Sequence, residues 1–134
     1  MRTEWIAAGV GGGLGWLARH GMNTLVARRS AHPVPYATLI VNVAGCAVIG
    51  VLAGLLASQR ISMGPVMRVF VFVGILGGFT TFSSFGLDTF TLARAGRMAA
   101  PCWNVAIPVG IGLPAVAGGY ALGLALGGRP DPLP

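Results

Sequence analysis

The sequence predicts an all-α membrane protein whose single domain, residues 1–134, crosses the bilayer four times. Its composition is 54% apolar and 9% charged, whereas about 25% of residues are charged in an ordinary soluble domain. Four apolar stretches are each near or above the roughly 20 residues that a helix needs to cross the hydrocarbon core. Short polar segments separate these stretches, so the pattern is that of a small helical membrane bundle.

The four predicted spans cover residues 5–26, 36–57, 66–92 and 102–126. The first follows Met1 and Arg2 and so resembles a secretory signal, but it lacks a small-x-small cleavage pattern and is predicted to be retained. Pro65 and Pro101 stand where the third and fourth helices can begin, because the first turn of a helix has no use for the missing N–H.

The third span is the unusual one. A continuous helix over its 27 residues would be roughly 40 Å long, so it must tilt, protrude or break. Near its centre it reads Gly-Gly-Phe-Thr-Thr-Phe-Ser-Ser-Phe from Gly77 to Phe85, and we predict a break at Gly77-Gly78. Irregular backbone at this depth is tolerated only where protein or a water-filled cavity satisfies it, so the break predicts an internal site.

This stretch offers groups suited to ions of either sign. Carbonyls released at residues 77–81 could hold a small cation, because hard cations prefer oxygen ligands. Phe82 and Phe85 are three residues apart and share a helix face; their ring edges are positive and could stabilise a small anion. The alternative is that the two rings merely pack and that the nearby hydroxyl groups bond back to their own helix.

Polar residues also interrupt the other spans. Arg19, near the inner end of the first span, either extends to the interface or lines an aqueous vestibule. Asn42 lies deeper and needs a partner, so it either joins two helices or faces a polar path. Thr38, one turn earlier on the same face, favours the path. Asp88 is predicted to cap a helix or to pair with an arginine near the interface.

All nine basic residues are arginines, the net charge is +6, and most of these arginines flank apolar runs. This pattern is typical of the ends of membrane spans and argues against a nucleic-acid partner. In a chain with four spans, the termini and the second loop lie on one side of the membrane, and their four arginines are Arg2, Arg60, Arg68 and Arg129. The first and third loops lie on the other side, and their four arginines are Arg28, Arg29, Arg94 and Arg97. Such a tie predicts insertion in both orientations, and hence an antiparallel homodimer. The alternative is a real bias that this count misses.

Small residues recur at helical spacing in three of the spans. They are Gly9 with Gly13, Gly11 with Gly15, Gly50 with Gly54, and the run Ala115, Gly119, Gly123 and Gly127. Small faces let helix backbones approach closely, so a tight bundle is expected. The two cysteines, Cys46 and Cys102, are interpreted as small packing residues.

The stretch Gly77 to Phe85, the segment Ala37 to Gly45 and the glycine-rich segment ending at Arg19 together resemble the Fluc-type (CrcB) fluoride channel family. The resemblance covers most of the chain. It implies a passive fluoride exporter of the bacterial cytoplasmic (inner) membrane, built as an antiparallel dual-topology homodimer with two fluoride pores. It also implies a structural sodium ion at the dimer centre.

Matching positions imply the site residues. Gly77 and Thr80 would offer backbone carbonyls to sodium, while Phe82 and Phe85 would present ring edges to fluoride. The remaining residues of the fluoride pathway would be Asn42 as an amide donor, Ser83 and Ser84 as hydroxyl donors, Thr38, and Arg19 in the vestibule.

The chain departs from the family pattern in two places. Ser84 stands where threonine is expected, which keeps a hydroxyl. The fourth span carries no tyrosine or serine where family members often place one; the matching region runs from Asn104 to Gly112. Pro108 and Pro114 are expected to threaten the continuity of this helix.

Two other classes of membrane protein stay open. A small dual-topology multidrug transporter would need a carboxylate deep in a span, whereas Glu4 and Asp88 lie near predicted ends. The other class is a membrane subunit that packs against a partner and transports nothing. An enzyme is not expected, because no catalytic constellation occurs at a workable spacing.

Overall fold

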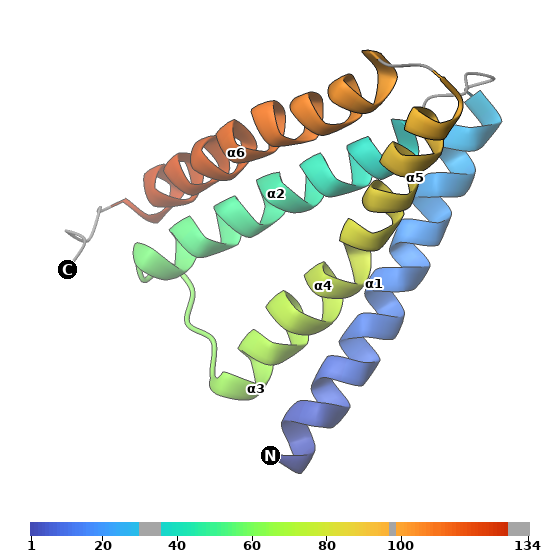
Figure 1. Cartoon of the computed structure of the whole chain (residues 1–134). Helices are drawn as coiled ribbons and strands as arrows, with labels where there is room; N and C mark the ends of the chain where they lie inside the picture. Colours follow the sequence, from blue (N-terminus) through green and yellow to red (C-terminus); the bar gives the residue numbers. More distant parts are fainter. Residues whose placement is uncertain (30–35, 97–98, 129–134) are drawn as a thin grey trace.

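A computed structural model of the chain describes residues 1–29, 36–96 and 99–128, and these residues form helices joined by short connections (Figure 1). The helices are α1 (Arg2–Arg29), α2 (Tyr36–Ala57), α3 (Pro65–Arg68), the π-helix η1 (Val69–Leu76), α4 (Gly77–Phe79), α5 (Phe82–Arg94) and α6 (Ala99–Gly127). The elements α3, η1, α4 and α5 follow one another closely and make up the third long segment. The predicted all-α class is confirmed for the described residues.

Three of these segments are long and apolar enough to cross a membrane, namely Tyr36–Ala57, Pro65–Arg94 and Ala99–Gly127. The predicted first span lies within α1, a helix of 28 residues. This helix is long enough, but its many glycines and the polar residues Arg19, His20 and Asn23 make its composition less apolar than that of the other three segments. The helix predicted from the sequence is therefore present, but α1 is less apolar than a typical membrane span.

The long segments are arranged as two pairs that diverge from one end of the molecule. Helix α6 lies along α2, and α1 lies along the third segment (Figure 1). The pairs meet where α5, the start of α2 and the end of α1 come together. At the opposite, open end lie the start of α1 and the end of α6, as expected for four long segments that alternate in direction.

Glycines hold α2 against α6. Gly50 and Gly54 on α2, and Gly119 and Gly123 on α6, are buried. A Cβ atom on any of the four would meet backbone atoms of the facing helix. The close approach expected from their spacing is therefore present, and it is made between backbones.

A second glycine contact joins α1 to the third segment. Gly11 and Gly15 on α1 pack against the backbone near Gly74 and Gly78. Of the predicted small residues on α1, however, Gly9 and Gly13 face open space, since no described atom lies within 4 Å of a Cβ built there. One small face of α1 thus packs against the third segment, and the other has no described neighbour within the chain.

The expected position of the break in the third segment was wrong. Gly77 and Gly78 are helical, whereas Thr80 (φ −81°, ψ 160°) and Thr81 (φ −152°, ψ 120°) are extended. Gly78 lies against the backbone of Gly12 in α1, and this packing keeps the glycine pair in helical conformation. The change of direction therefore comes after the glycines, at the two threonines.

Helix α6 is continuous through Pro108 and Pro114, so the expected interruption is absent. A proline within a helix removes one hydrogen bond and leaves the carbonyl four residues earlier without its helical donor. Packing against neighbouring helices makes this tolerable inside a membrane protein. For Pro108, the affected carbonyl belongs to Asn104.

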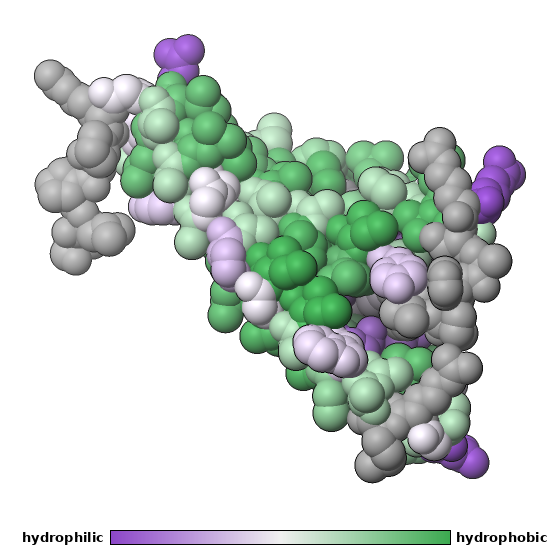
Figure 2. All heavy atoms as spheres, turned by 90° about the horizontal axis from the view of Figure 1, so that it is seen from above, coloured by the Kyte–Doolittle hydropathy of each residue, from purple (hydrophilic) through white to green (hydrophobic). Residues whose placement is uncertain are grey.

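The surface of the chain is largely apolar. Figure 2 shows hydrophobic side chains over most of the visible face, with the strongly hydrophilic residues concentrated at its ends. Among described residues, the buried large apolar side chains are Val41, Leu76 and Leu92. Most large apolar side chains thus face outward, which suits lipid or a partner chain. Of the arginines counted for orientation, Arg97 and Arg129 lie outside the described residues.

Candidate functional site: a groove at the helix break

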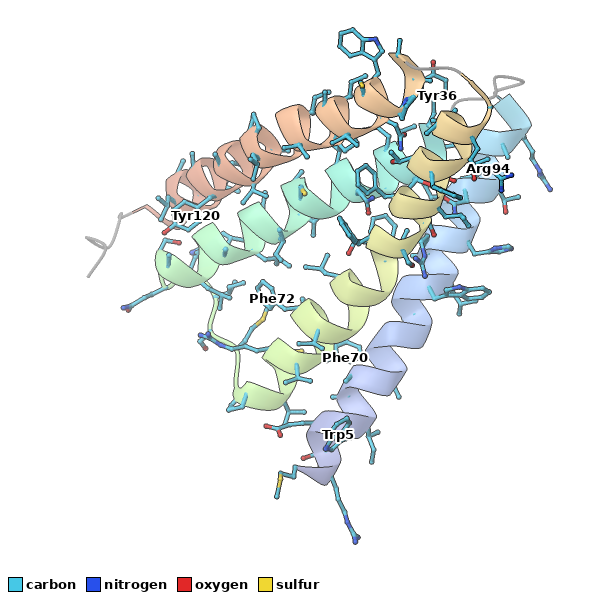
Figure 3. The ribbon with its side chains drawn as sticks, in the orientation of Figure 1. Trp5, Tyr36, Phe70, Phe72, Arg94 and Tyr120 are labelled. Atoms are coloured by element: carbon cyan, nitrogen blue, oxygen red, sulfur yellow. The ribbon has the colours of Figure 1, made fainter. Side chains whose placement is uncertain are left out.

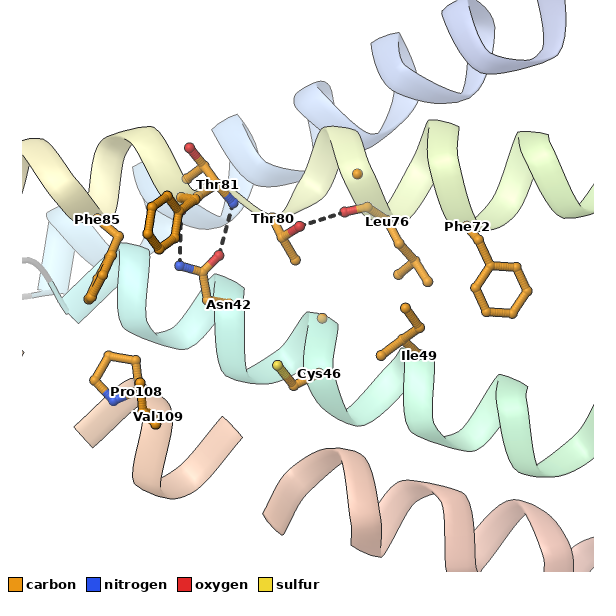
Figure 4. Close-up of a pocket in the computed structure, with 13 residues that line it drawn as sticks. Asn42, Cys46, Ile49, Phe72, Leu76, Thr80, Thr81, Phe85, Pro108 and Val109 are labelled. Carbon is orange, nitrogen blue, oxygen red and sulfur yellow. Dashed lines mark hydrogen bonds between the residues drawn. The ribbon is translucent and has the colours of Figure 1, made fainter. Parts of the chain in front are cut away.

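A groove of about 410 Å³ opens between α2, the third segment and α6 (Figure 4). Phe72 points into the opening between η1 and α2 (Figure 3). Most of the lining is apolar, and the polar groups gather at the helix break. The lining residues are Asn42, Gly45, Cys46, Ile49, Phe72, Leu76, Gly77, Thr80, Thr81, Phe82, Phe85, Pro108 and Val109.

Asn42 bridges α2 to the break. Its Oδ1 accepts a hydrogen bond from the Thr81 N–H at 2.9 Å, and its Nδ2 donates to the Thr81 carbonyl at 3.1 Å (Figure 4). Both polar groups of the extended Thr81 peptide are therefore satisfied by one side chain. Because an amide nitrogen carries two hydrogens, Asn42 keeps a second donor. It joins two helices and also lines the groove.

Thr81 starts the next helix. Its Oγ1 accepts a hydrogen bond from the Ser84 N–H at 3.3 Å, as an N-cap residue does. The same hydroxyl lies 3.3 Å from Ser83 Oγ and donates to Ser84 Oγ at 3.2 Å. Three hydroxyl groups thus form a cluster at the first turn of α5.

Because of these hydrogen bonds, two backbone carbonyl groups lack the N–H donors that a continuous helix would supply. In an uninterrupted helix the Thr81 N–H would donate to the Gly77 carbonyl, and the Ser84 N–H would donate to Thr80. Asn42 Oδ1 and Thr81 Oγ1 take these two donors instead. The carbonyl oxygens of Gly77 and Thr80 are the ligand type that a hard cation prefers. Within the described ranges, no group of three or more His, Cys, Asp or Glu side chains could hold a metal ion.

Two phenylalanines of α5 line the groove beyond the break. The ring centroids of Phe82 and Phe85 lie 5.5 Å apart, with their planes tilted by 42°. Phe85 is half-buried, whereas Phe82 is 83% exposed. Rings in this arrangement can present positive edges toward the groove.

A second hydrogen bond joins α2 to α5. Thr38 Oγ1 donates to Asp88 Oδ2 at 2.9 Å. The expected cap or arginine partner of Asp88 is therefore replaced by a threonine on the neighbouring helix. Thr38 does not contribute to the groove lining; its hydroxyl points to α5 instead.

A third link comes from α6. Asn104 Nδ2 donates to Thr89 Oγ1 at 2.8 Å, and Thr89 Oγ1 donates to the Phe85 carbonyl at 2.8 Å. Asn104, in the region that departs from the family pattern, thus points to α5. The part of the groove wall that α6 supplies is Pro108 and Val109.

This geometry agrees with what comparison of the sequence finds. A family profile described as "CrcB-like protein, Camphor Resistance (CrcB)" matches residues 6–120. The chain belongs to this family. The resemblance seen in the third-span motif is thereby confirmed, and with its apolar helices the chain is a multi-pass membrane protein.

Relatives of this CrcB-like chain carry a functional name. It is 41% identical to "Fluoride-specific ion channel FluC" of Paracoccus denitrificans (strain Pd 1222) over 126 residues, which is 94% of this chain and 98% of the relative. It is 41% identical to the protein of that name from Salinibacter ruber (strain DSM 13855 / M31), over 97% of this chain and 95% of the relative. These names support a fluoride channel function.

The structure brings five of the proposed site residues of this CrcB-like chain to one groove: Asn42, Gly77, Thr80, Phe82 and Phe85. The others lie apart from its lining. They are Ser83 and Ser84 in the adjoining hydroxyl cluster, Thr38 one turn before Asn42 and bonded to Asp88, and the half-buried Arg19 on α1.

Sequence reasoning missed three groups of residues at or near the groove. Thr81 directly precedes a helix, which is an N-cap signal. Cys46 follows Asn42 by four residues and so shares its face of α2, where it lines the groove, while Cys102 is exposed near the start of α6. Thr89 and its bond to Asn104 carry no sequence signal, because the two residues lie on different helices.

Proposed function

We propose that this chain is a fluoride-selective channel through which fluoride crosses the bacterial cytoplasmic membrane passively. One observation carries the proposal: the Asn42 amide and the rings of Phe82 and Phe85 line one groove at the helix break, in a chain whose relatives are named fluoride-specific ion channels.

The chemistry of the groove suits fluoride. This ion is small and strongly hydrated, so a pore must replace its water with several donors while holding it weakly enough for release. Asn42 has an amide hydrogen beyond the one that Thr81 uses, and the phenylalanine ring edges add weak positive charge. The hydroxyls of Ser83 and Ser84 lie next along α5. None of these groups carries a full charge that would trap the ion.

The functional unit in this proposal is an antiparallel homodimer. The groove is open, Phe82 is 83% exposed on it, and the small face made by Gly9 and Gly13 is uncovered among the described residues. A second copy would cover these features. Its packing along α1 would also allow this less apolar helix to cross the bilayer, as the other three segments can. Reporter fusions at the C-terminus should show both orientations; one orientation throughout would contradict antiparallel pairing.

A structural sodium ion is part of the proposal. The carbonyls of Gly77 and Thr80 would hold it, since their helical donors are bound elsewhere. A sodium ion bound by these carbonyl oxygens would neutralise their partial negative charge. Replacing sodium with the larger potassium ion should weaken the dimer in detergent. A dimer indifferent to this exchange would remove sodium from the proposal.

The decisive experiment is ion flux from liposomes containing the purified protein. We expect fast fluoride release and negligible chloride release. Phe82→Ile and Phe85→Ile should each slow fluoride release at least about tenfold, which corresponds to about 1.4 kcal/mol on the barrier. Phe90→Ile is the matched control, because Phe90 is also exposed on α5 but does not line the groove. A folded wild-type protein that releases no fluoride would overturn the proposal.

A further inference from the structure

Apolar burial alone does not fix the position of α5 within the subunit. Of its 13 residues, Leu92 is the one that is buried in the described part of the chain. The large side chains of Phe82, Leu87 and Phe90 are all more than half exposed. What holds the rings of α5 at the groove must therefore include its polar contacts.

The contact from α6 has a defined direction. A threonine hydroxyl has one hydrogen and two lone pairs. Thr89 uses its hydrogen on the Phe85 carbonyl, so it receives the Asn104 Nδ2–H on a lone pair; both bonds are 2.8 Å. The chain of donors therefore runs from amide to hydroxyl to carbonyl, and it ends on a residue whose ring lines the groove.

The tether joins two walls of the groove. Pro108 lies one turn after Asn104 and forms part of the wall supplied by α6, while Phe85 forms part of the wall supplied by α5. Pro108 has no N–H, so this turn of α6 lacks one backbone hydrogen bond. The Asn104 side chain thus ties α6 to α5 at a turn where α6 has one backbone hydrogen bond fewer.

We propose that Asn104 is a positioning residue that acts through Thr89 to fix the Phe85 ring relative to the α6 wall of the groove. The inference rests on the proposed function of that groove. It also explains how the fourth helix contributes to the path without placing a hydroxyl side chain in it: Asn104 sets the spacing of the two walls through Thr89 and the Phe85 carbonyl.

The test compares fluoride release per folded protein among variants in liposomes. Asn104→Leu and Thr89→Val should each slow release about five- to tenfold, the scale of one net hydrogen bond. The double variant should be no slower than either single one, because both changes remove the same bond. Thr89→Ser keeps the hydroxyl and should restore release. Thr91→Val is the control, since the Thr91 hydroxyl is exposed and forms no hydrogen bond among described residues.

A second readout does not depend on conduction. With 4-fluorophenylalanine at position 85, the ¹⁹F resonance of the ring should shift or broaden in Asn104→Leu and Thr89→Val but not in Thr91→Val. Asn104→Ser, too short to reach Thr89, replaces Asn104→Leu if the latter does not fold. Unchanged release and an unchanged resonance in a folded variant would overturn the inference. A wild-type protein without fluoride release would instead overturn the proposed function, while the resonance would still test the tether.

Discussion

The α2–α6 pair and helix α5 are held in place by different means. Buried glycines bring the backbones of α2 and α6 into direct contact along their length. Helix α5 buries little apolar surface. Thr38 of α2 and Asn104 of α6 donate hydrogen bonds to residues of α5, and Asn42 of α2 is hydrogen-bonded to Thr81, the residue that caps α5. In lipid, helices gain nothing from hiding apolar surface from water, so close packing and hydrogen bonds are the two available means of association.

The contrast shows how the chain divides its tasks. Contact between backbones depends on shape along a whole helix and tolerates no added atom. A hydrogen bond from a side chain fixes one point and is worth about 0.6 to 2 kcal/mol in a membrane protein. The closely packed pair thus serves as the scaffold, and the tethered helix carries the rings, whose placement a few bonds can set.

The largest effect is expected from adding a side chain to the closely packed pair. Gly119→Leu should destabilise the protein by about 3 kcal/mol or more, because its Cβ would meet the backbone of Ala47 and Val51. Gly118→Leu is the matched control, since open space surrounds a Cβ at Gly118 among the described residues. Thermal unfolding in detergent measures both variants. Equal stability of the two would show that the pair is not held by backbone contact.

A smaller loss of stability is expected when Asn42, which bridges α2 to the extended residue Thr81, is replaced. Asn42→Leu leaves the Thr81 N–H and carbonyl without their partner and should cost about 1–3 kcal/mol. Asn42→Asp keeps an acceptor for the Thr81 N–H but sets a carboxyl oxygen against the Thr81 carbonyl, so it should be destabilising as well. Asn23→Leu is a suitable control, because Asn23 Oδ1 is buried without a hydrogen bond in the described structure. Unfolding in denaturant should rank the three variants; an Asn42→Leu variant as stable as wild type would contradict the bridge.

The smallest effect is expected from a single tether. Thr38→Val should cost about 1 kcal/mol through the lost bond to Asp88, and Thr38→Ser should retain most of the stability. A double-mutant cycle with Asp88→Ala, which removes the acceptor, measures the coupling between the two side chains. Additive effects in that cycle would show that this bond does not hold α5 to α2.

The sequence predicted what depends on local pattern. Apolar length predicted the long helices. The spacing of Gly50, Gly54, Gly119 and Gly123 predicted close packing of helices, and the structure shows that these glycines bring α2 and α6 together. The three-residue spacing of Phe82 and Phe85 likewise placed both rings on one side of α5. Each of these features follows from helical geometry alone.

The remaining features depend on contacts between helices. The break was expected at Gly77-Gly78, but Gly78 is helical and packs against α1. The extended residues are Thr80 and Thr81, and Asn42 of α2 supplies the replacement bonds at Thr81. The continuity of α6 through Pro108 likewise reflects support from its neighbours. No local pattern indicates which residue on a distant helix will complete such a bond.

The Asn42–Thr81 contact has a parallel in another class of structure. Thr81 has the dihedral angles of a strand, and it exchanges both N–H···O bonds with a planar amide, as two facing residues of an antiparallel sheet do. The Asn42 side chain thus plays the part of a neighbouring strand one peptide long. Unlike a strand, it can withdraw by rotating about its own side-chain bonds. This bridge can therefore open and close while α2 and α5 both stay folded.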